Sequence, residues 1–430
     1  MVKALYGLRM SGKCWHDRLY DVLRDMGFIP SKAEPDIWMR DCGDHYEYIA
    51  AYVDDLLICS RKPQTIIDML EAAPHSFKLK GTGPMKYHLG CDYFRDDDGT
   101  LCASPKKYIQ RMIDQYETVF GEKPRRTYKS PIDAEEHPEL DTSPLLTDDG
   151  ITKYQSIIGT LQWAITLGRF DIAVAVATMS SFNAAPREGH LEHLKRIVGY
   201  LSGMKDACIR IRTHKPDFSS LPKLEYDWTR SVYGKVEYQD PTDAPEPKGK
   251  SVVTSSWVDA NLQHCHATGR AMNGALHFLN GTPIEWFAKK QPTVETATYG
   301  SEFVAARNAT QQILGIRTTL AYLGVKVDKA SYLFGDNQSV VTSGTVPHSP
   351  NKKRHHALSY HFVREAIAAG VLLFHYVSSK CNVADIVSKH WRYTAVWPML
   401  QAVLFWKGDT AELLHPHKAG EFASEGSSEI

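Results

Sequence analysis

Two adjacent aspartates, Asp54 and Asp55, have the plainest chemical potential in this 430-residue chain. They interrupt two apolar runs, Ile49–Tyr52 and Leu56–Cys59, a pattern that predicts a β-hairpin with both aspartates at its turn. Two carboxylates on a rigid turn suit Mg²⁺, which prefers hard oxygen ligands and keeps room for substrate phosphates. An ordinary Asp-Asp turn is the alternative on these residues alone.

A second group of acidic residues follows much later in the chain. We expect Asp259 to end a strand and Asp336 to follow another strand. Glu302 lies inside a long predicted helix, and Asp385 begins a short one. Strand ends and helix starts at one edge of a mixed sheet are where such folds bind ligands. Four carboxylates in one cleft repel unless cations neutralise them, so the group predicts bound metal, although each acid alone could simply cap an element.

The elements that must hold these acids predict an α/β and α+β, multidomain chain. Amphipathic helices are expected near residues 12–26 and 64–72, on either side of the hairpin. Three strands and then alternating helices and strands, from residue 251 onward, predict a mixed β-sheet covered by helices. The expected parts are the hairpin region (1–80), a region of short strands and helices (81–215), a linker rich in Pro and acid (216–250), the mixed-sheet domain (251–392) and a fraying polar tail (393–430).

Charge says little about the whole chain, because 50 basic residues balance 50 acidic ones. Local basic clusters could contact phosphates, with solvated surface as the equal alternative. Trp163 and Trp286 are expected in cores rather than on a base-stacking surface. The candidates for nucleic-acid binding are Lys289, Lys290, Lys352, Lys353 and Arg354.

Cysteine usage indicates a reducing compartment, because the eight cysteines are scattered without a Cys-x-x-Cys pair. No signal peptide is recognised, so secretion is not expected. No membrane span is expected either, because Gln162, Arg169 and Asp171 interrupt the most apolar stretch. The run His264-Cys265-His266 is weak evidence for zinc, because adjacent residues rarely surround one tetrahedral ion.

Several short motifs follow one another in a fixed order. Tyr52-Val-Asp-Asp-Leu-Leu is followed by Tyr87-His-Leu-Gly and Tyr154-Gln-Ser-Ile-Ile-Gly-Thr-Leu. Later come Asp259-Ala, Ser301-Glu-Phe, Asp336-Asn-Gln-Ser and Ala384-Asp. In this order the motifs resemble the Pol polyprotein of copia-type LTR retrotransposons, in the part that covers the distal reverse transcriptase and the ribonuclease H domain. The resemblance spans roughly residues 3–391.

The resemblance implies a partial reverse-transcriptase palm with thumb and connection, followed by a ribonuclease H-like mixed-sheet domain. It implies that Asp54 binds metal beside its neighbour Asp55, and that a second set of carboxylates cleaves RNA in RNA–DNA hybrids with two Mg²⁺ ions, or Mn²⁺ in their place. The implied partners are the hybrid, retroelement RNA and DNA, and other Pol or Gag products, in the cytoplasm (virus-like particle) or nucleus. The implied ribonuclease H carboxylates are Asp259, Glu302, Asp336 and Asp385.

Polymerisation needs a third aspartate on an earlier palm strand, because the hairpin alone cannot bridge two metals. The family places that strand and the fingers before Lys3-Ala-Leu-Tyr-Gly, and this sequence starts at Met1. We therefore expect ribonuclease H activity without DNA synthesis. Two alternatives stay open: a catalytically inactive nucleic-acid-binding remnant, and a subunit that complements a separate palm and fingers chain.

Overall fold

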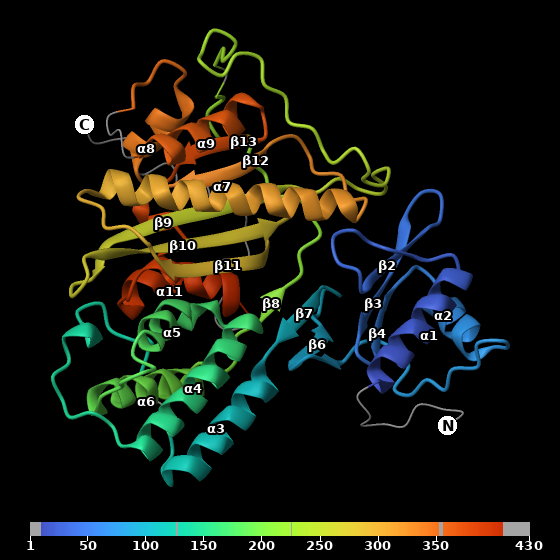
Figure 1. Ribbon diagram of the computed structural model, residues 1–430, viewed down its shortest axis with the longest axis horizontal. Helices are drawn as coiled ribbons and strands as arrows, with labels where there is room; N and C mark the ends of the chain where they lie inside the picture. The colour runs from blue at the N-terminus through green and yellow to red at the C-terminus, as the bar shows by residue number, and fades with distance from the viewer. Residues whose placement is uncertain (1–9, 126–127, 225, 352–355, 407–430) are drawn as a thin grey trace. The chain divides into compact units, whose positions relative to one another are not determined.

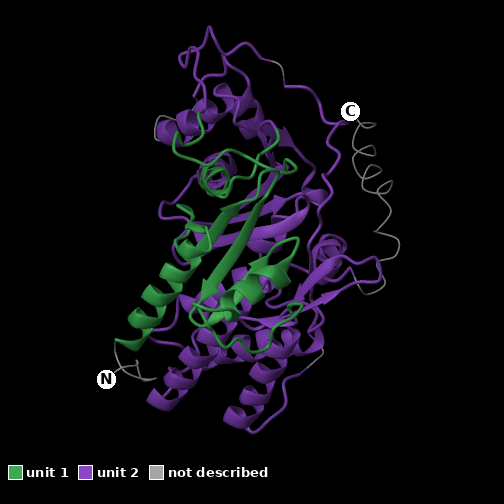
Figure 2. Ribbon diagram, turned by 90° about the vertical axis from the view of Figure 1, so that its right-hand side faces the viewer, with its two compact units in different colours: residues 1–85, 239–252, 314–328 green, residues 86–238, 253–313, 329–430 purple. Residues whose placement is uncertain are grey.

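The structure is a computed structural model that describes residues 10–125, 128–224, 226–351 and 356–406 (Figure 1). The chain forms two compact units (Figure 2). Unit 1 comprises residues 1–85, 239–252 and 314–328, and unit 2 comprises residues 86–238, 253–313 and 329–430. None of the helices in the described ranges is long and apolar enough to cross a bilayer.

Unit 1 is built on a four-stranded antiparallel sheet in the order β1-β2-β3-β4. Two helices cover it with the amphipathic faces that the sequence predicts, and Leu23, Trp38 and Ile66 lie in the core between them. The predicted hairpin is confirmed. The elements are α1 (Ser11–Asp25), β1 (Ile29–Pro30), β2 (Ile37–Asp41), β3 (Tyr46–Tyr52), β4 (Asp55–Cys59) and α2 (Pro63–Glu71).

The first part of unit 2 is a small antiparallel sheet followed by four helices. Residues 87–95 form two short strands of the kind expected in this region, and Leu89 and Gly90 turn the chain between them with φ values of 50° and 97°. The helix α5 was not predicted. The elements are β5 (Tyr87–His88), β6 (Cys91–Arg95), β7 (Leu101–Ser104), α3 (Lys106–Phe120), α4 (Asp148–Thr166), α5 (Ala173–Ser180), α6 (Glu188–Gly203) and β8 (Ile209–Arg210).

The rest of unit 2 contains a five-stranded mixed sheet in the order β11-β10-β9-β12-β13. The first three strands are antiparallel, and β9, β12 and β13 run parallel. This order confirms the predicted mixed sheet. The strands are β9 (Thr254–Cys265), β10 (Arg270–Leu279), β11 (Thr282–Lys290), β12 (Ser331–Gly335) and β13 (Leu372–Tyr376); the helices are α7 (Thr298–Tyr322), α8 (Gln338–Thr345), α9 (Ala357–Ala368), α10 (Asp385–Ser388) and α11 (Tyr393–Leu404).

Helices cover both faces of this sheet, and α7 crosses it in Figure 1. Val258 and Ala275 belong to the core that includes residues of α7, α8 and α9. Leu276 and Phe278 point the other way, into the core shared with α5, α6, α10 and α11. The mixed-sheet region and residues 86–238 therefore share one hydrophobic core within unit 2.

One expectation about the later chain is wrong. The polar tail expected from residue 393 begins as the helix α11, whose residues Val396, Met399, Leu400 and Leu404 form a buried stripe at helical spacing. The run of polar residues at the end of the chain hid this stripe, and residues 407–430 lie outside the described part. The described residues of the segment expected as a linker, 216–224 and 226–250, contain no helix or strand, and Phe218 among them lies 4.6 Å from Tyr332, ring centre to ring centre.

Candidate active site

Three of the predicted acidic residues lie together in unit 2. The ligand oxygens of Asp259, Glu302 and Asp336 all lie within 4.8 Å of one another. The sheet register explains the meeting of two of them: Gly335 ends β12 opposite Val258 in the parallel pair β9–β12. The next residues of both strands, Asp336 and Asp259, therefore lie side by side at that edge, and Glu302 reaches them from α7.

Asp259 does not end its strand, contrary to the sequence expectation. It lies in the middle of β9, opposite Gly274 of β10, because the antiparallel pairing continues as far as Cys265. Only the parallel pairing with β12 stops before it. The result is a carboxylate on a rigid strand, 1 % exposed, at the point where the neighbouring strand ends.

The first turn of α7 is fixed by close packing, and this sets the position of Glu302. Glu295 and His356 are both buried, with 2.9 Å between the Oε2 and Nε2 atoms. Gly300 lies against this pair, and a Cβ there would approach both side chains to 2.7 Å or less. Gln291 adds a hydrogen bond of 2.8 Å from its Nε2 to the carbonyl of Ser301.

Asp385 reaches the group because α10 packs directly on the sheet. A Cβ on Gly274 would lie 2.7 Å from the Cβ of Ser388, so only glycine allows this approach. The buried Asn382 donates from Nδ2 to the carbonyl of Val258 at 3.0 Å, which ties the start of α10 to β9 beside Asp259.

Lys389 connects the last aspartate to the others. Its Nζ atom lies 2.7 Å from Oδ1 of Asp385 and 3.3 Å from Oδ2 of Asp259. The Ser388 hydroxyl donates a short hydrogen bond to the same Asp259 oxygen. The sequence reading missed both residues, although Lys389 stands four positions after Asp385, a spacing that brings opposite charges together on one helical face.

Burial and mutual repulsion raise the pKa values of Asp259, Glu302 and Asp385. Burial raises the pKa of Asp259, and burial together with the Asp259 and Asp336 carboxylates raises that of Glu302 well above its usual range. The pKa of Asp385 rises to about 7, through burial and then Asp259. Burial alone would lower the pKa of Lys389, but Asp259 and Asp385 outweigh it and raise it. Four clustered acids with one lysine form a hard-oxygen donor set that suits Mg²⁺ or Mn²⁺.

Asp54 and Asp55 lie in unit 1, and both side chains are exposed. Asp54 occupies the turn, whereas Asp55 is already the first residue of β4 and pairs with Tyr52, so only one of the two is at the turn itself. Val53 has a φ of 56°, a left-handed conformation that strains a β-branched residue. The indole Nε1 of Trp15 donates to the Val53 carbonyl at 2.7 Å and holds this turn.

The predicted basic residues are only partly described. Lys289 and Lys290 lie on β11 and line a groove together with Arg270 and polar side chains of α7. Lys290 donates from Nζ to the Ser181 hydroxyl at 2.9 Å. Lys352, Lys353 and Arg354 lie outside the described residues.

The two tryptophans differ. Trp286 packs against Phe170, with 5.2 Å between ring centres, so its prediction as a core residue is confirmed. Trp163 is 43 % exposed, so the same prediction is wrong for it. It lies on the outer face of α4 and lines a surface hollow with Tyr87 and Arg111.

Comparison with known proteins agrees with these features. Residues 1–125 match the family model described as "Reverse transcriptase (RNA-dependent DNA polymerase)". Over 91 % of its length the chain is 27 % identical to the "Retrovirus-related Pol polyprotein from transposon RE1" of Arabidopsis thaliana. Over 72 % it is 24 % identical to a putative transposon Ty5-1 protein of Saccharomyces cerevisiae, of which it covers 87 %.

Similar solved structures include a foamy viral protease-reverse transcriptase in complex with double-stranded DNA, with 10 % identity, a TM-score of 0.40 and coverage of 86 % of this chain and 49 % of that one. Another is the LC11 RNase H1 with an RNA/DNA hybrid, with 13 % identity, a TM-score of 0.26 and coverage of 32 % and 94 %. With scores this low, the description of the fold rests on the strand order and register above.

The chain spans only about a quarter of the length of the long polyproteins that it matches. The chain spans 24 % of the RE1 polyprotein and 26 % of the TNT 1-94 polyprotein of Nicotiana tabacum, to which it is 22 % identical over 90 % of its own length. The alignments nevertheless run through both units. The resemblance predicted from the motifs is thus confirmed: the chain is similar over most of its length to copia-type retrotransposon Pol polyproteins, and its first 125 residues match the reverse transcriptase family model.

Proposed function

We propose that unit 2 hydrolyses RNA in RNA–DNA hybrids with the help of divalent metal ions. One observation carries the proposal: oxygens of Asp259, Glu302 and Asp336, from three separate elements, meet within 4.8 Å. Buried carboxylates repel one another at such distances, so an arrangement of this kind is stable only with protons or cations between them. Asp385 joins the group through Lys389.

The donor set fits magnesium or manganese, because all four groups are carboxylates and these ions prefer oxygen ligands. Asp259, Glu302, Asp336 and Asp385 would hold the metal, which would activate a water and stabilise the leaving oxygen of the phosphodiester. The protein itself would contribute by holding the carboxylates in fixed positions. Asp259 is fixed by Ser388 and Lys389, and Glu302 by the packed first turn of α7.

The substrate would be recognised by charge and shape. Hybrid recognition uses phosphates and the 2′-hydroxyls of the RNA strand rather than base edges. Lys289 and Lys290, with Arg270 beside them, offer positive charge and polar groups in one groove of unit 2. Lys352, Lys353 and Arg354 stay candidates for the same role.

The experiment is cleavage of a labelled RNA–DNA hybrid by the 430-residue chain in Mg²⁺ or Mn²⁺, with EDTA as the blank. We expect cleavage that falls by at least about a hundredfold in Asp336→Asn, because a metal-ligand carboxylate is removed. Asp54→Asn is the matched control, since it makes the same chemical change on the exposed turn of unit 1, and it should cleave like the native chain. Absence of cleavage by the native chain, or equal cleavage by Asp336→Asn, refutes the proposal.

Two alternatives give different results in the same assay. A binding remnant would hold the hybrid with a steep salt dependence and leave it intact. A complementing subunit would acquire polymerase activity only with a separate chain that supplies the third palm aspartate. For the chain alone we expect no primer extension, and extension that Asp54→Asn abolishes would contradict this. We infer partners among retroelement RNA, DNA and Pol or Gag products, in cytoplasmic virus-like particles or the nucleus.

A further inference from the structure

We propose that His137, Glu139 and His266 form a second metal site in unit 2, of the zinc type and separate from the carboxylate cluster. Glu139 lies within the short 3₁₀ turn at Pro138–Leu140, and His137 directly precedes that turn. His266 lies in the turn between β9 and β10, at the end of the motif His264-Cys265-His266. The two segments are more than a hundred residues apart in sequence, so sequence spacing could not reveal their meeting.

The three side chains form a compact ligand group. One ligand atom from each lies within 4.8 Å of the others. Nδ1 of His137 is 3.4 Å from Oε1 of Glu139, and the backbone N–H of His266 donates to the same oxygen at 2.8 Å. The backbone hydrogen bond fixes the carboxylate beside the two imidazole rings, which stack on each other with 3.9 Å between their centres.

This donor set matches zinc better than magnesium. Two imidazoles and one carboxylate form a ligand set of zinc sites that keep a fourth position open, whereas magnesium prefers oxygen ligands. The rings are tilted by only 25°, so a bound ion requires one ring to rotate out of the stack until both nitrogens point to a common centre. His266 is exposed and the His137 side chain is 35 % exposed, so the rotation has room.

Two neighbouring histidines support the site rather than join it. Nε2 atoms of His264 and His390 lie 3.0 and 3.3 Å from the hydroxyl of Thr178. Nδ1 of His264 is also engaged, at 3.2 Å from the Asn261 amide nitrogen. These bonds hold the base of the β9–β10 turn against α5 and leave His266 as the member of the motif that is turned toward Glu139.

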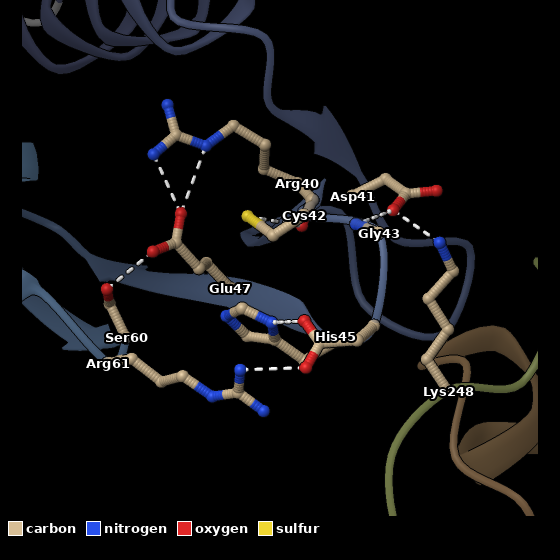
Figure 3. Close-up of polar contacts among 10 residues, drawn as sticks. Arg40, Asp41, Cys42, Gly43, His45, Glu47, Ser60, Arg61 and Lys248 are labelled. Atoms are coloured by element: carbon tan, nitrogen blue, oxygen red, sulfur yellow. Dashed lines mark hydrogen bonds and ion pairs between the residues drawn. The ribbon is translucent and has the colours of Figure 1, made fainter.

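Unit 1 contains a second group of possible metal ligands, Cys42, His45 and Glu47 (Figure 3). In this group the carboxylate is already bound by other side chains. Both oxygens of Glu47 are taken, by Arg40 at 2.7 Å and by the Ser60 hydroxyl at 2.6 Å. The pairing with Arg40 also neutralises the charge that would attract a cation. The Glu139 carboxylate faces imidazoles in place of an arginine, so a metal would not have to displace a guanidinium there.

A metal at this position would join two parts of unit 2. It would fasten the long irregular segment between α3 and α4 to the turn between two central strands of the mixed sheet. The expected effect is therefore structural as well as chemical: Zn²⁺ should raise the melting temperature of unit 2 and protect residues 129–147 from proteolysis.

The test is binding of Zn²⁺ to the EDTA-treated full chain in excess Mg²⁺, followed by calorimetry, with Co²⁺ as the spectroscopic probe. The native chain should bind one equivalent through nitrogen and oxygen ligands. His137→Ala, His266→Ala and Glu139→Gln should each weaken binding by at least about tenfold. Glu139→Gln guards against misfolding, because its amide oxygen can still accept the His266 hydrogen bond.

Two controls separate this site from the others. Asp336→Asn alters the carboxylate cluster and should bind Zn²⁺ like the native chain, so this result is independent of the proposed nuclease. His45→Ala should also bind normally. Binding unchanged in His137→Ala and His266→Ala, or a Co²⁺–thiolate absorption band that these variants leave in place, would show zinc on surface thiols and overturn the proposal.

Discussion

Lys389 is the charged side chain on which the balance of the acidic cluster depends. Its Nζ atom contacts Asp385 and Asp259, the positions where a bound cation would also be attracted. A metal ion at the proposed site would therefore compete with the lysine for the same negative charge, although the lysine stabilises the cluster when metal is absent. Side-chain positions of this kind depend on packing, which no sequence motif encodes.

Replacing Lys389 by methionine tests this competition. We expect a lower melting temperature in EDTA, because the buried acids lose their counter-charge, and Mn²⁺ binding tighter by about fivefold or more, because two carboxylates are released. Calorimetric titration and thermal unfolding measure the two effects. Lys290→Met is the matched control, since it removes the same side chain from the same unit. Weaker metal binding by Lys389→Met would show that the lysine assists the metal instead.

Asp385 gives a prediction about pH. The pKa of this group is about 7 in the folded chain, while an unfolded aspartate titrates near 3.9. Between about pH 4 and pH 7 the folded state binds the extra proton, so ionisation of Asp385 costs stability as the pH rises through this window. In EDTA, Asp385→Asn should gain up to roughly 4 kcal/mol in unfolding free energy, relative to the native chain, from pH 4 to pH 8, because the two pKa values differ by about 3 units. Urea denaturation at the two pH values measures it, and a constant difference would contradict it.

At the scale of elements, α10 is the piece whose position decides whether the four acids meet. It is a helix of only four residues, held by Asn382 and by direct contact with Gly274 of β10. The sequence predicted the acids and most of the strands, because alternating and helical patterns are local. It did not predict that a glycine on a neighbouring strand admits this helix, since that contact joins residues over a hundred positions apart.

Gly274→Ala is the corresponding test. The added Cβ would lie 2.7 to 2.8 Å from atoms of Ser388 and Val387, so α10 must shift. We expect a loss of about 1–3 kcal/mol in stability from overpacking, together with reduced hybrid cleavage as Asp385 moves. Gly159→Ala is the control: it lies within α4 with nothing within 4 Å, and it should stabilise the chain by about 0.5–1 kcal/mol. Equal stability of the two variants would refute the packing argument.

The helix α11 was not predicted, because the composition of a chain end does not reveal a short apolar stripe within it. Val396, Met399, Leu400 and Leu404 repeat at helical spacing and are buried, although the polar residues that follow them dominate the composition of the chain end. Pro398 stands inside this helix.

At the scale of the whole molecule, the mixed sheet does not form a domain with its own complete core. Leu276 and Phe278 lie in a cluster shared with helices from residues 148–203 and with α11. The sequence suggested a boundary at 251–392 because it follows strand order, whereas the core follows contacts in space. Removing the other helices would expose one apolar face of the sheet.

A fragment of residues 251–392 should therefore bind a hydrophobic dye such as ANS and melt well below the full chain. A fragment of residues 86–406 keeps α3 to α6 and α11. It should bind much less dye and melt closer to the full chain. Dye fluorescence and thermal unfolding provide the comparison. Equal behaviour of the two fragments would mean that the sheet is stable without the covering helices.

Unit 1 is assembled from three stretches of chain, and Tyr48 of the first donates its hydroxyl to the Leu323 carbonyl of the third at 2.6 Å. The ring of Tyr46 packs directly against Gly324, so a Cβ at that position would clash with it. These contacts between distant stretches of the chain restrict how such elements can recombine. A recombination event that joins two parents anywhere between residues 86 and 313 inherits these partners from different ancestors, so viable exchanges should preserve them as a linked pair.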